Sequence, residues 1–189
     1  MGAVLSVRRI AGYVVLVGLL AACGSSGSPG SAHRGGATSP TVSGAALITH
    51  TDSAFSLSYP AQWDYKEGTG RYGIYNNFVG PKASSGYEPA VLVGRTVRAD
   101  AQAFADGMTL FQTIHPDRKL QPAQSATVQG AVKADIIRST RTFKGTPIES
   151  WNVFVLTPSR VALNVEFVAP TAEFDTALMQ RILDSLVAR

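Results

Sequence analysis

The chain contains a single cysteine in 189 residues, and only 16% of its residues are charged. One cysteine excludes an intramolecular disulfide and a zinc site made of several thiolates, so the fold must be stabilised by packing. A strong basic balance is also missing. Two of the 17 basic residues, Arg8 and Arg9, lie in a segment that we expect to be removed, which leaves 15 basic and 13 acidic side chains. This near-neutral balance predicts that nucleic acid is not a partner.

The composition is nevertheless that of a folded protein. Apolar residues make up 45% of the chain and aromatic residues 8%. These fractions exclude a wholly disordered, collagen-like or polytopic membrane protein. The length fits one domain with an appendage.

The appendage is at the amino terminus, where Arg8 and Arg9 precede an apolar run from Ile10 to Leu20. This run is too short to span a bilayer core, which needs about 20 apolar residues. Basic residues followed by a short apolar run are typical of a secretion signal. The pattern favours general secretion over myristoylation at Gly2 and over twin-arginine export.

The sequence Leu20-Ala21-Ala22-Cys23-Gly24 follows directly and contains the only cysteine. It resembles the lipobox of bacterial lipoproteins. The resemblance implies cleavage between Ala22 and Cys23 and a diacylglycerol on the Cys23 thiol. We therefore expect a signal peptide at residues 1–22 and a mature protein held at the extracytoplasmic face of the cell membrane by its lipid.

After Cys23 the chain is rich in Gly, Ser and Pro and almost free of large apolar side chains. Such a composition cannot repay the entropy of ordering, so residues 23–46 are predicted to be a lipidated, flexible tether. The folded domain is predicted at residues 47–189.

Within the domain, residues 54–59 alternate with period two and predict a strand that ends at Pro60, with Trp63 in the core behind it. Further strands are predicted at Gly73–Val79 and at Ala90–Arg98. Asp100 is placed to cap a helix that buries Phe104, Met108 and Phe111 and ends at His115-Pro116.

The last third predicts three strands, Val132–Phe143, Pro147–Leu156 and Arg160–Val168, joined by short turns. In the third strand, alternation predicts that Ala162, Asn164 and Glu166 face solvent. A final helix is predicted from about Thr171, with an apolar stripe that ends at Leu186. The expected fold class is α+β, with helices packed on an antiparallel sheet.

This order of elements, with FSLSYPAQW near its start and TAEFDTALMQRILDSL at its end, resembles the actinobacterial lipoproteins of the LpqN and LpqT type. The similarity covers about residues 47–189. The resemblance implies a PsbP-like sandwich that serves as a non-enzymatic accessory or binding domain, and it supplies no catalytic residue.

A search for catalytic motifs finds no GxSxG, HExxH, P-loop or dinucleotide fingerprint. We therefore predict no enzymatic activity, no cofactor and no metal site. Two His-x-Asp pairs, His50 with Asp52 and His115 with Asp117, have a spacing that can orient an imidazole or share a metal. Both lie in turn-like sequence, which favours exposed turn residues over a catalytic role.

Two surfaces are candidates for recognition. The first is an aromatic and amide-rich loop, because tyrosines supply large amphipathic contacts; its residues are Tyr72, Tyr75, Asn76, Asn77, Phe78 and Tyr87. The second is a basic group on one sheet edge, for which solvation and edge protection are the stronger interpretation; it comprises Arg95, Arg98, Arg138, Arg141 and Lys144.

The leading hypothesis is a membrane-anchored envelope lipoprotein whose domain binds a protein or an envelope component. A carrier of a lipid or another hydrophobic molecule is a second hypothesis, and it requires a cavity lined by Phe104, Phe111, Trp151 or Phe167. A hydrolase that uses His50 or His115 is a third.

Overall fold

The computed structural model describes residues 44–70, 73–97 and 101–189. The predicted signal peptide at residues 1–22, its cleavage site at Ala22 and Cys23, and nearly all of the predicted tether lie outside the described residues. So do Tyr72, Arg98 and Asp100. Among the described residues, no helix is long and apolar enough to cross a membrane.

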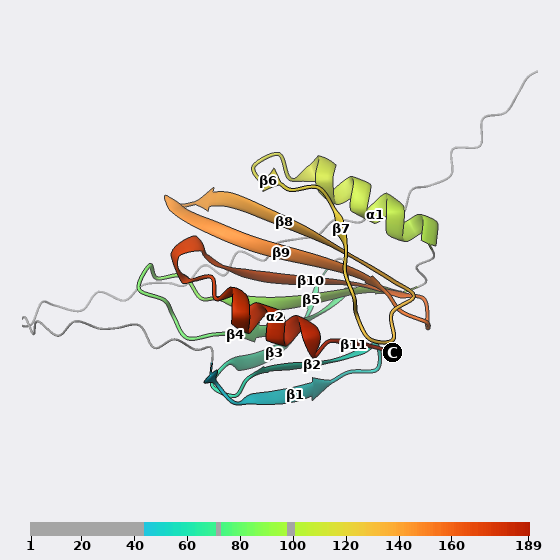
Figure 1. The fold of residues 1–189 in the computed structure, drawn as a ribbon, viewed down its shortest axis with the longest axis horizontal. Coiled ribbons are helices and arrows are strands. Elements are labelled where there is room, and N and C mark those ends of the chain that lie inside the picture. Colours follow the sequence, from blue (N-terminus) through green and yellow to red (C-terminus); the bar gives the residue numbers. More distant parts are fainter. Residues whose placement is uncertain (1–43, 71–72, 98–100) are drawn as a thin grey trace, which may run out of the picture.

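The chain folds into two antiparallel sheets (Figure 1). The smaller has the order β1-β2-β11 and consists of β1 (Leu47–Thr51), β2 (Phe55–Pro60) and β11 (Val187–Ala188). β2 confirms the strand predicted at residues 54–59. Its Phe55, Leu57 and Tyr59 are buried, and Trp63, which follows the strand, is in the same core.

The larger sheet has the order β3-β4-β5-β10-β9-β8-β6, with β7 also paired to β8. Its strands are β3 (Asp64–Gly70), β4 (Gly73–Val79), β5 (Ala90–Val97), β6 (Lys119–Leu120), β7 (Gln124–Ser125), β8 (Lys133–Phe143), β9 (Thr146–Leu156) and β10 (Val161–Pro170). The five predicted strands in this sheet are confirmed within a few residues at each end. No strand was predicted at β3, β6 or β7, nor at β1 or β11 in the smaller sheet.

The turn between β8 and β9 fixes the register of the centre of the sheet. Lys144 and Gly145 are its two central residues, and both have positive φ, at 49° and 81°. A two-residue turn of this kind matches the twist of its flanking strands and leaves no freedom to slip. Phe143 therefore pairs with Thr146, and Ile137 lies opposite Asn152.

The main helices are α1 (Ala101–Ile114) and α2 (Thr176–Asp184), with a short 3-10 helix, η2 (Thr171–Glu173), before α2. α2 begins later than predicted because the Asp175 side chain caps it, accepting a hydrogen bond from the Leu178 amide at 2.9 Å. Leu186 lies beyond the end of α2 and is still fully buried.

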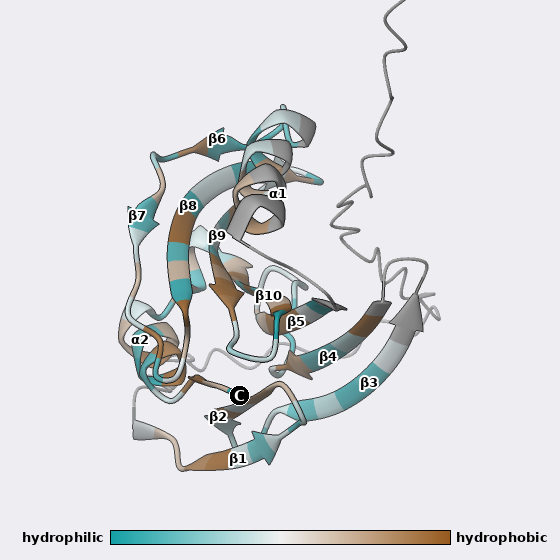
Figure 2. Cartoon of the chain, turned by 90° about the vertical axis from the view of Figure 1, so that its right-hand side faces the viewer, coloured by the Kyte–Doolittle hydropathy of each residue, from teal (hydrophilic) through white to brown (hydrophobic). Residues whose placement is uncertain are grey.

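α1 lies on one side of the large sheet, and α2 lies on the other side with the small sheet (Figures 1 and 2). We call the two surfaces of the large sheet the α1 face and the α2 face. The α2 face contributes to the largest buried apolar cluster, together with side chains of α2 and β2; its members include Val91, Val93, Ile136, Trp151, Val153, Val155, Leu163, Val165 and Phe167. On the α1 face, Phe104, Met108 and Phe111 of α1 share a second cluster with Ile137, Phe154, Leu156 and Ala162.

One prediction about β10 is wrong. Ala162 and Glu166 were expected to face solvent, and they are only 9% and 3% exposed. Alternation in β10 correctly separates two faces, but both faces are covered, because the chain from α1 to β6 passes over the second one. The fold is α+β and is dominated by antiparallel sheet.

Candidate functional site

The centre of the α1 face carries polar side chains in three neighbouring strands. In the register of the sheet, Asn152 of β9 lies opposite Glu166 of β10. On its other side Asn152 lies opposite Ile137 of β8, two residues before the buried Ser139 on the same face. Asn164 is two residues from Glu166 and so projects from the same face. Asn152 is completely buried and Glu166 is nearly so.

Arg118 reaches this row from above the sheet. It lies between α1 and β6, where its amide donates to the His115 carbonyl in a turn, at 3.1 Å. Its Nη1 donates to Glu166 Oε1 at 2.9 Å, and the two side chains are 0% and 5% exposed. The guanidinium carbon lies 5.6 Å from the centre of the Phe111 ring, within the range of a cation–π contact. This ion pair joins the segment after α1 to the centre of the sheet.

Several polar atoms around this ion pair are buried without a partner. Among the described residues, ten buried side-chain N and O atoms have no hydrogen-bond partner. Eight of them belong to the α1 face and the segment above it: His115 Nε2, Arg118 Nε and Nη2, Ser139 Oγ, Arg141 Nε, Asn152 Nδ2 and Oδ1, and Asn164 Oδ1. We name Arg118, Ser139, Arg141, Asn152, Asn164 and Glu166 the α1-face polar cluster. Such a concentration is unusual, because buried polar groups are nearly always hydrogen-bonded.

Apolar side chains flank the α1-face polar cluster. On one side is the cluster that includes Phe104 and Phe111. On the other is a third buried cluster of Ala90, Ile148 and Val168, against which Tyr87 and Phe143 pack. The polar side chains are thus surrounded by material of low dielectric constant, where each hydrogen bond or charge interaction is stronger than in water.

Two titratable groups at the margin of the cluster respond to its charges. Burial raises the pKa of Tyr87, while the charge of Arg141 and its hydrogen bond to the phenol act in the opposite direction. Burial also lowers the pKa of His115, and the positive charge of Arg118 lowers it further. Both groups therefore favour their neutral forms, and both lie within electrostatic range of Arg118, Arg141 and Glu166.

The chemistry available here is recognition by hydrogen bonds and charge. The cluster presents guanidinium and amide donors, two amide oxygens and one hydroxyl. Among the described residues, no group of three or more His, Cys, Asp and Glu side chains is placed to hold a metal ion.

The residues predicted as an interaction surface do not form one loop. Tyr75, Asn76 and Asn77 lie in β4, which pairs with β3 and β5 on its two sides. Asn76 faces the core at 1% exposure, and its Oδ1 accepts a hydrogen bond from the Tyr65 hydroxyl at 2.8 Å. Phe78 is likewise buried in the core. Tyr75 and Asn77 project from the α1 face, on which Tyr87 also packs.

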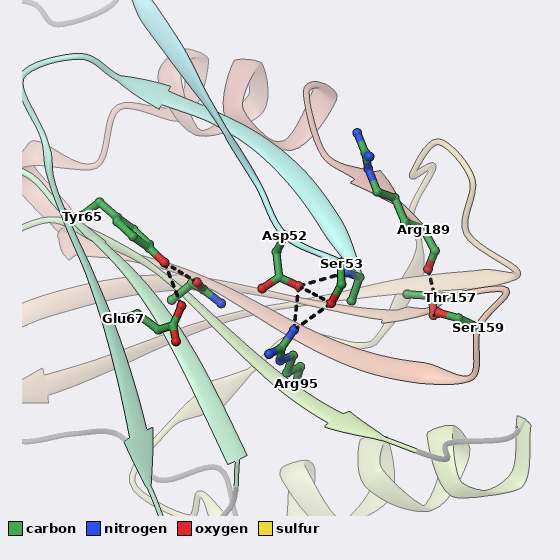
Figure 3. A network of polar contacts seen from close by, with 10 residues as sticks. Asp52, Ser53, Tyr65, Glu67, Arg95, Thr157, Ser159 and Arg189 are labelled. Atoms are coloured by element: carbon green, nitrogen blue, oxygen red, sulfur yellow. Dashed lines mark hydrogen bonds and ion pairs between the residues drawn. The ribbon is translucent and has the colours of Figure 1, made fainter.

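A second polar group lies near the β1–β2 turn, between the two sheets (Figure 3). Arg95 of β5 donates to Asp52 Oδ1 at 2.6 Å and to Ser53 Oγ at 3.3 Å. Asp52 also accepts from the Ala54 amide. These bonds fasten the turn to the large sheet, which is a structural role.

In each of the two His-x-Asp pairs, the histidine packs on an aromatic ring and the aspartate contacts an arginine. His50 packs its ring 4.4 Å from that of Tyr65, while Asp52 is bound to Arg95. The His115 ring lies 4.7 Å from that of Phe111, and Asp117, which is 60% exposed, approaches Arg141 at 3.9 Å.

Two other expected groupings are corrected by the register. Phe104 and Phe111 lie on the α1 face, whereas Trp151 and Phe167 lie on the α2 face, so these four rings do not line one cavity.

The basic residues that were expected to gather on one sheet edge are also divided. Arg95 is in the interior of the sheet and faces the core, and Arg138 stacks on Trp151 of the α2 face, 4.8 Å from its ring centre. Arg141 and Lys144 both contact Phe143, at the turn after β8.

Sequence reasoning missed Arg118, Ser139, Asn152, Asn164 and Glu166 as a group. One signal was present in β9, where Asn152 interrupts the run Trp151-Asn152-Val153-Phe154-Val155-Leu156. A continuous apolar run in a strand indicates burial on both faces. An amide inside such a run is therefore a buried polar group.

Comparison with known proteins supports the fold. No protein-family model and no curated protein matches the chain. Among solved structures, it is similar to LpqN of Mycobacterium tuberculosis, a protein involved in cell envelope biogenesis, with 18% identity and a TM-score of 0.53 over 75% of this chain and 88% of LpqN. It is also similar to PA94 of Pseudomonas aeruginosa, a protein of unknown function, with 16% identity and a TM-score of 0.52 over 76% of this chain and 97% of PA94. At these identities the chain shares with both proteins a distantly related fold.

Proposed function

We propose that this chain is a lipid-anchored protein of the bacterial cell envelope whose domain binds a ligand without transforming it, at the α1-face polar cluster. The observation that carries the binding role is the set of eight unpartnered, buried polar atoms around the Arg118–Glu166 ion pair. A buried polar group without a partner destabilises the fold by about 1–3 kcal/mol. Side chains that persist at such a cost are typical of binding and catalytic sites.

The envelope location rests on the amino-terminal sequence and on the fold. The basic and apolar segments before Cys23 match a lipoprotein signal. The fold resembles that of LpqN, which is involved in cell envelope biogenesis. We propose on the same grounds that the domain is a PsbP-like sandwich of the LpqN and LpqT type.

A binding role fits the cluster better than catalysis. Asp52, the acidic partner in the first His-x-Asp pair, is held by Arg95, and the ring of His115 packs on Phe111. Among the described residues, the Nε2 atoms of both histidines are buried without a hydrogen-bond partner, so neither nitrogen is bonded to a hydroxyl that it could activate.

The location is tested with a Cys23→Ser variant expressed in a bacterium with its full signal. The wild-type chain should fractionate with membranes and begin at a Cys23 that carries acyl chains in mass spectrometry. The variant should appear in the aqueous fraction, because the thiol that accepts the lipid is gone. Equal membrane retention of the two chains, with acyl chains still present on the variant in mass spectrometry, would contradict lipid anchoring at Cys23.

The binding role is tested by native mass spectrometry of the 23–189 chain that carries Cys23→Ser, which retains every described contact. The chain is incubated with an extract of the bacterial envelope and purified again under native conditions. It should then carry a bound small molecule. Asn152→Leu should remove that molecule, whereas Asn77→Leu, at the margin of the same face, should retain it. A wild-type chain with no bound mass from any envelope extract would overturn the proposal.

A further inference from the structure

The unpartnered atoms of Arg118 form a defined recognition group. Arg118 contacts Glu166 through Nη1 alone, and its unpartnered atoms are Nε and Nη2. These two nitrogens carry the parallel N–H bonds on one edge of the guanidinium plane. This edge matches the two oxygens of a carboxylate or phosphate group, which accept the two bonds together.

The surroundings hold this edge in place. The guanidinium carbon lies over the Phe111 ring, Glu166 fixes Nη1, and the Arg118 side chain is 0% exposed. A long side chain restrained in this way loses little further freedom when a ligand binds, so its geometry is set in advance.

Donors outnumber acceptors among the unpartnered atoms of the region. Arg118 Nε, Arg118 Nη2, Arg141 Nε and Asn152 Nδ2 can only donate, whereas Asn152 Oδ1 and Asn164 Oδ1 can only accept. Ser139 Oγ and His115 Nε2 can do either. A group that only accepts hydrogen bonds suits this inventory, and an ionised oxygen acid is such a group.

The charges of the α1-face polar cluster also favour an anionic ligand. The cluster contains two guanidinium groups and one carboxylate, that of Glu166. Asp117 lies at the exposed margin of the cluster, beside Arg141. One positive charge is therefore in excess in the buried part, where solvent screens it least.

We infer that the α1-face polar cluster binds an oxyanion, the carboxylate or phosphate group of its ligand, through the Nε and Nη2 of Arg118. This inference rests on the proposed binding function and names the chemistry of the ligand. Arg141 and Asn152 supply further donors, and Glu166 holds Arg118 in position. The atoms concerned have almost no exposed surface, so the anion enters during a transient opening of the segment His115–Leu120, which carries Arg118, and it is held once this segment has closed again and Arg118 is back on Glu166.

That covering segment is lightly attached to the sheet. β6 contributes only two residue pairs with β8, and Pro116, Asp117 and Lys119 are exposed. Its further attachments are the buried ion pair of Arg118 with Glu166 and the packing of Leu120 against the apolar cluster under α1. Binding of an anion to Arg118 should therefore tighten the segment, which makes amide exchange a direct readout.

The test uses the 23–189 chain with Cys23→Ser and two probes, sodium phosphate and sodium acetate, each compared with sodium chloride at equal ionic strength. ¹⁵N NMR of the arginine Nε–H groups reports Arg118 directly. We expect a saturable shift of the Arg118 Nε–H signal with at least one probe, together with at least threefold slower amide exchange in residues 115–120. A response to phosphate alone indicates a phosphate group, and a response to acetate alone indicates a carboxylate.

Two variants locate the site. Arg118→Lys keeps a positive charge and removes the paired N–H edge, so it should weaken binding of the responding probe at least tenfold. Arg138→Lys is the matched control, because Arg138 stacks on Trp151 of the opposite face, and it should bind normally. If Arg118→Lys does not fold, the NMR titration of the wild-type chain decides alone.

The failure of this inference can be separated from that of the proposed function. If neither anion moves the Arg118 signal beyond the chloride control, the oxyanion inference is overturned. If Asn152→Leu nevertheless removes a neutral molecule that co-purifies with the wild-type chain, the binding function stands with a different ligand class.

Discussion

The two faces of the large sheet are built from alternating residues of the same strands, and they have opposite characters. The α2 face is sealed by apolar packing, with Val91, Val153, Val165 and Phe167 all fully buried. The α1 face is covered as well, yet its centre contains an ion pair and eight polar atoms without partners. Burial alone therefore does not distinguish the face that stabilises the fold from the face that we assign to binding.

Hydrogen-bond satisfaction does distinguish them. On the side of the α2 face, only His50 Nε2 and Asn76 Nδ2 are buried without a partner among the described residues. Asn76 still has its Oδ1 bonded to Tyr65, whereas both polar atoms of the Asn152 side chain are unpartnered. The comparison predicts that an amide added to the α2 face will lower stability, whereas removal of an unpartnered amide from the α1 face will raise it.

The largest effect is expected at the ion pair. Glu166→Leu leaves the Arg118 guanidinium buried without its carboxylate and should lower the free energy of unfolding by about 3–5 kcal/mol. The double variant Arg118→Met with Glu166→Leu should return close to wild-type stability, because both charges are then absent. Urea denaturation of all chains measures this. A double variant at least as unstable as Glu166→Leu alone would contradict this expectation, because the loss would then not come from the unpaired guanidinium.

A smaller loss is expected from placing an amide on the α2 face. Val153→Asn should lower the free energy of unfolding by about 3 kcal/mol, since it removes a fully buried apolar side chain and buries an amide without a partner. Urea denaturation at pH 7 is the measurement. A loss below about 1 kcal/mol would mean that the α2 face tolerates polar groups as the α1 face does.

The neighbouring residue should respond in the opposite direction. Asn152→Leu replaces an unpartnered amide by an apolar side chain of similar shape, so it should raise the free energy of unfolding by about 1 kcal/mol. The same chain should lose its ligand, which is the usual compromise between stability and activity at a binding site. Destabilisation by Asn152→Leu would show that the amide contributes to packing or has partners in solution.

The strands that could be predicted from the sequence are those with apolar runs, and the strands that could not are polar or very short. Strands β5, β8, β9 and β10 were predicted because each is a strand-like run between turns, apolar at the start of β5 and alternating with period two in β10. β3 was missed because its sequence, DYKEGTG, is polar, as befits an edge strand. β6, β7 and β11 are only two residues long, and such bridges depend on tertiary contacts instead of local pattern.

The candidate site was missed for a different reason. Alternation in β10 places Asn164 and Glu166 together on one face, but it cannot tell whether solvent or another part of the chain covers that face. The partner of Glu166 is Arg118, 48 residues away, in a segment with no periodic pattern of its own. A pairing of this kind is long-range and becomes visible only when the fold brings the segment over the sheet.

The smallest predicted effect concerns His115, where the covering segment meets α1. Burial and the charge of Arg118 lower its pKa below the ordinary value of 6.5, although Asp117 and Glu166 oppose the shift. As the pH falls through about 6.5, the unfolded chain therefore takes up a proton before the folded chain does, and folding stability is lost. His115→Phe keeps the ring contact with Phe111 and removes this titration, so its stability should fall less than that of the wild type between pH 7.5 and pH 5.5. Groups that titrate in both chains cancel in the difference between them. An equal fall in the two chains would show that His115 is as open to solvent when folded as when unfolded, and that the segment above the α1-face polar cluster does not shield it.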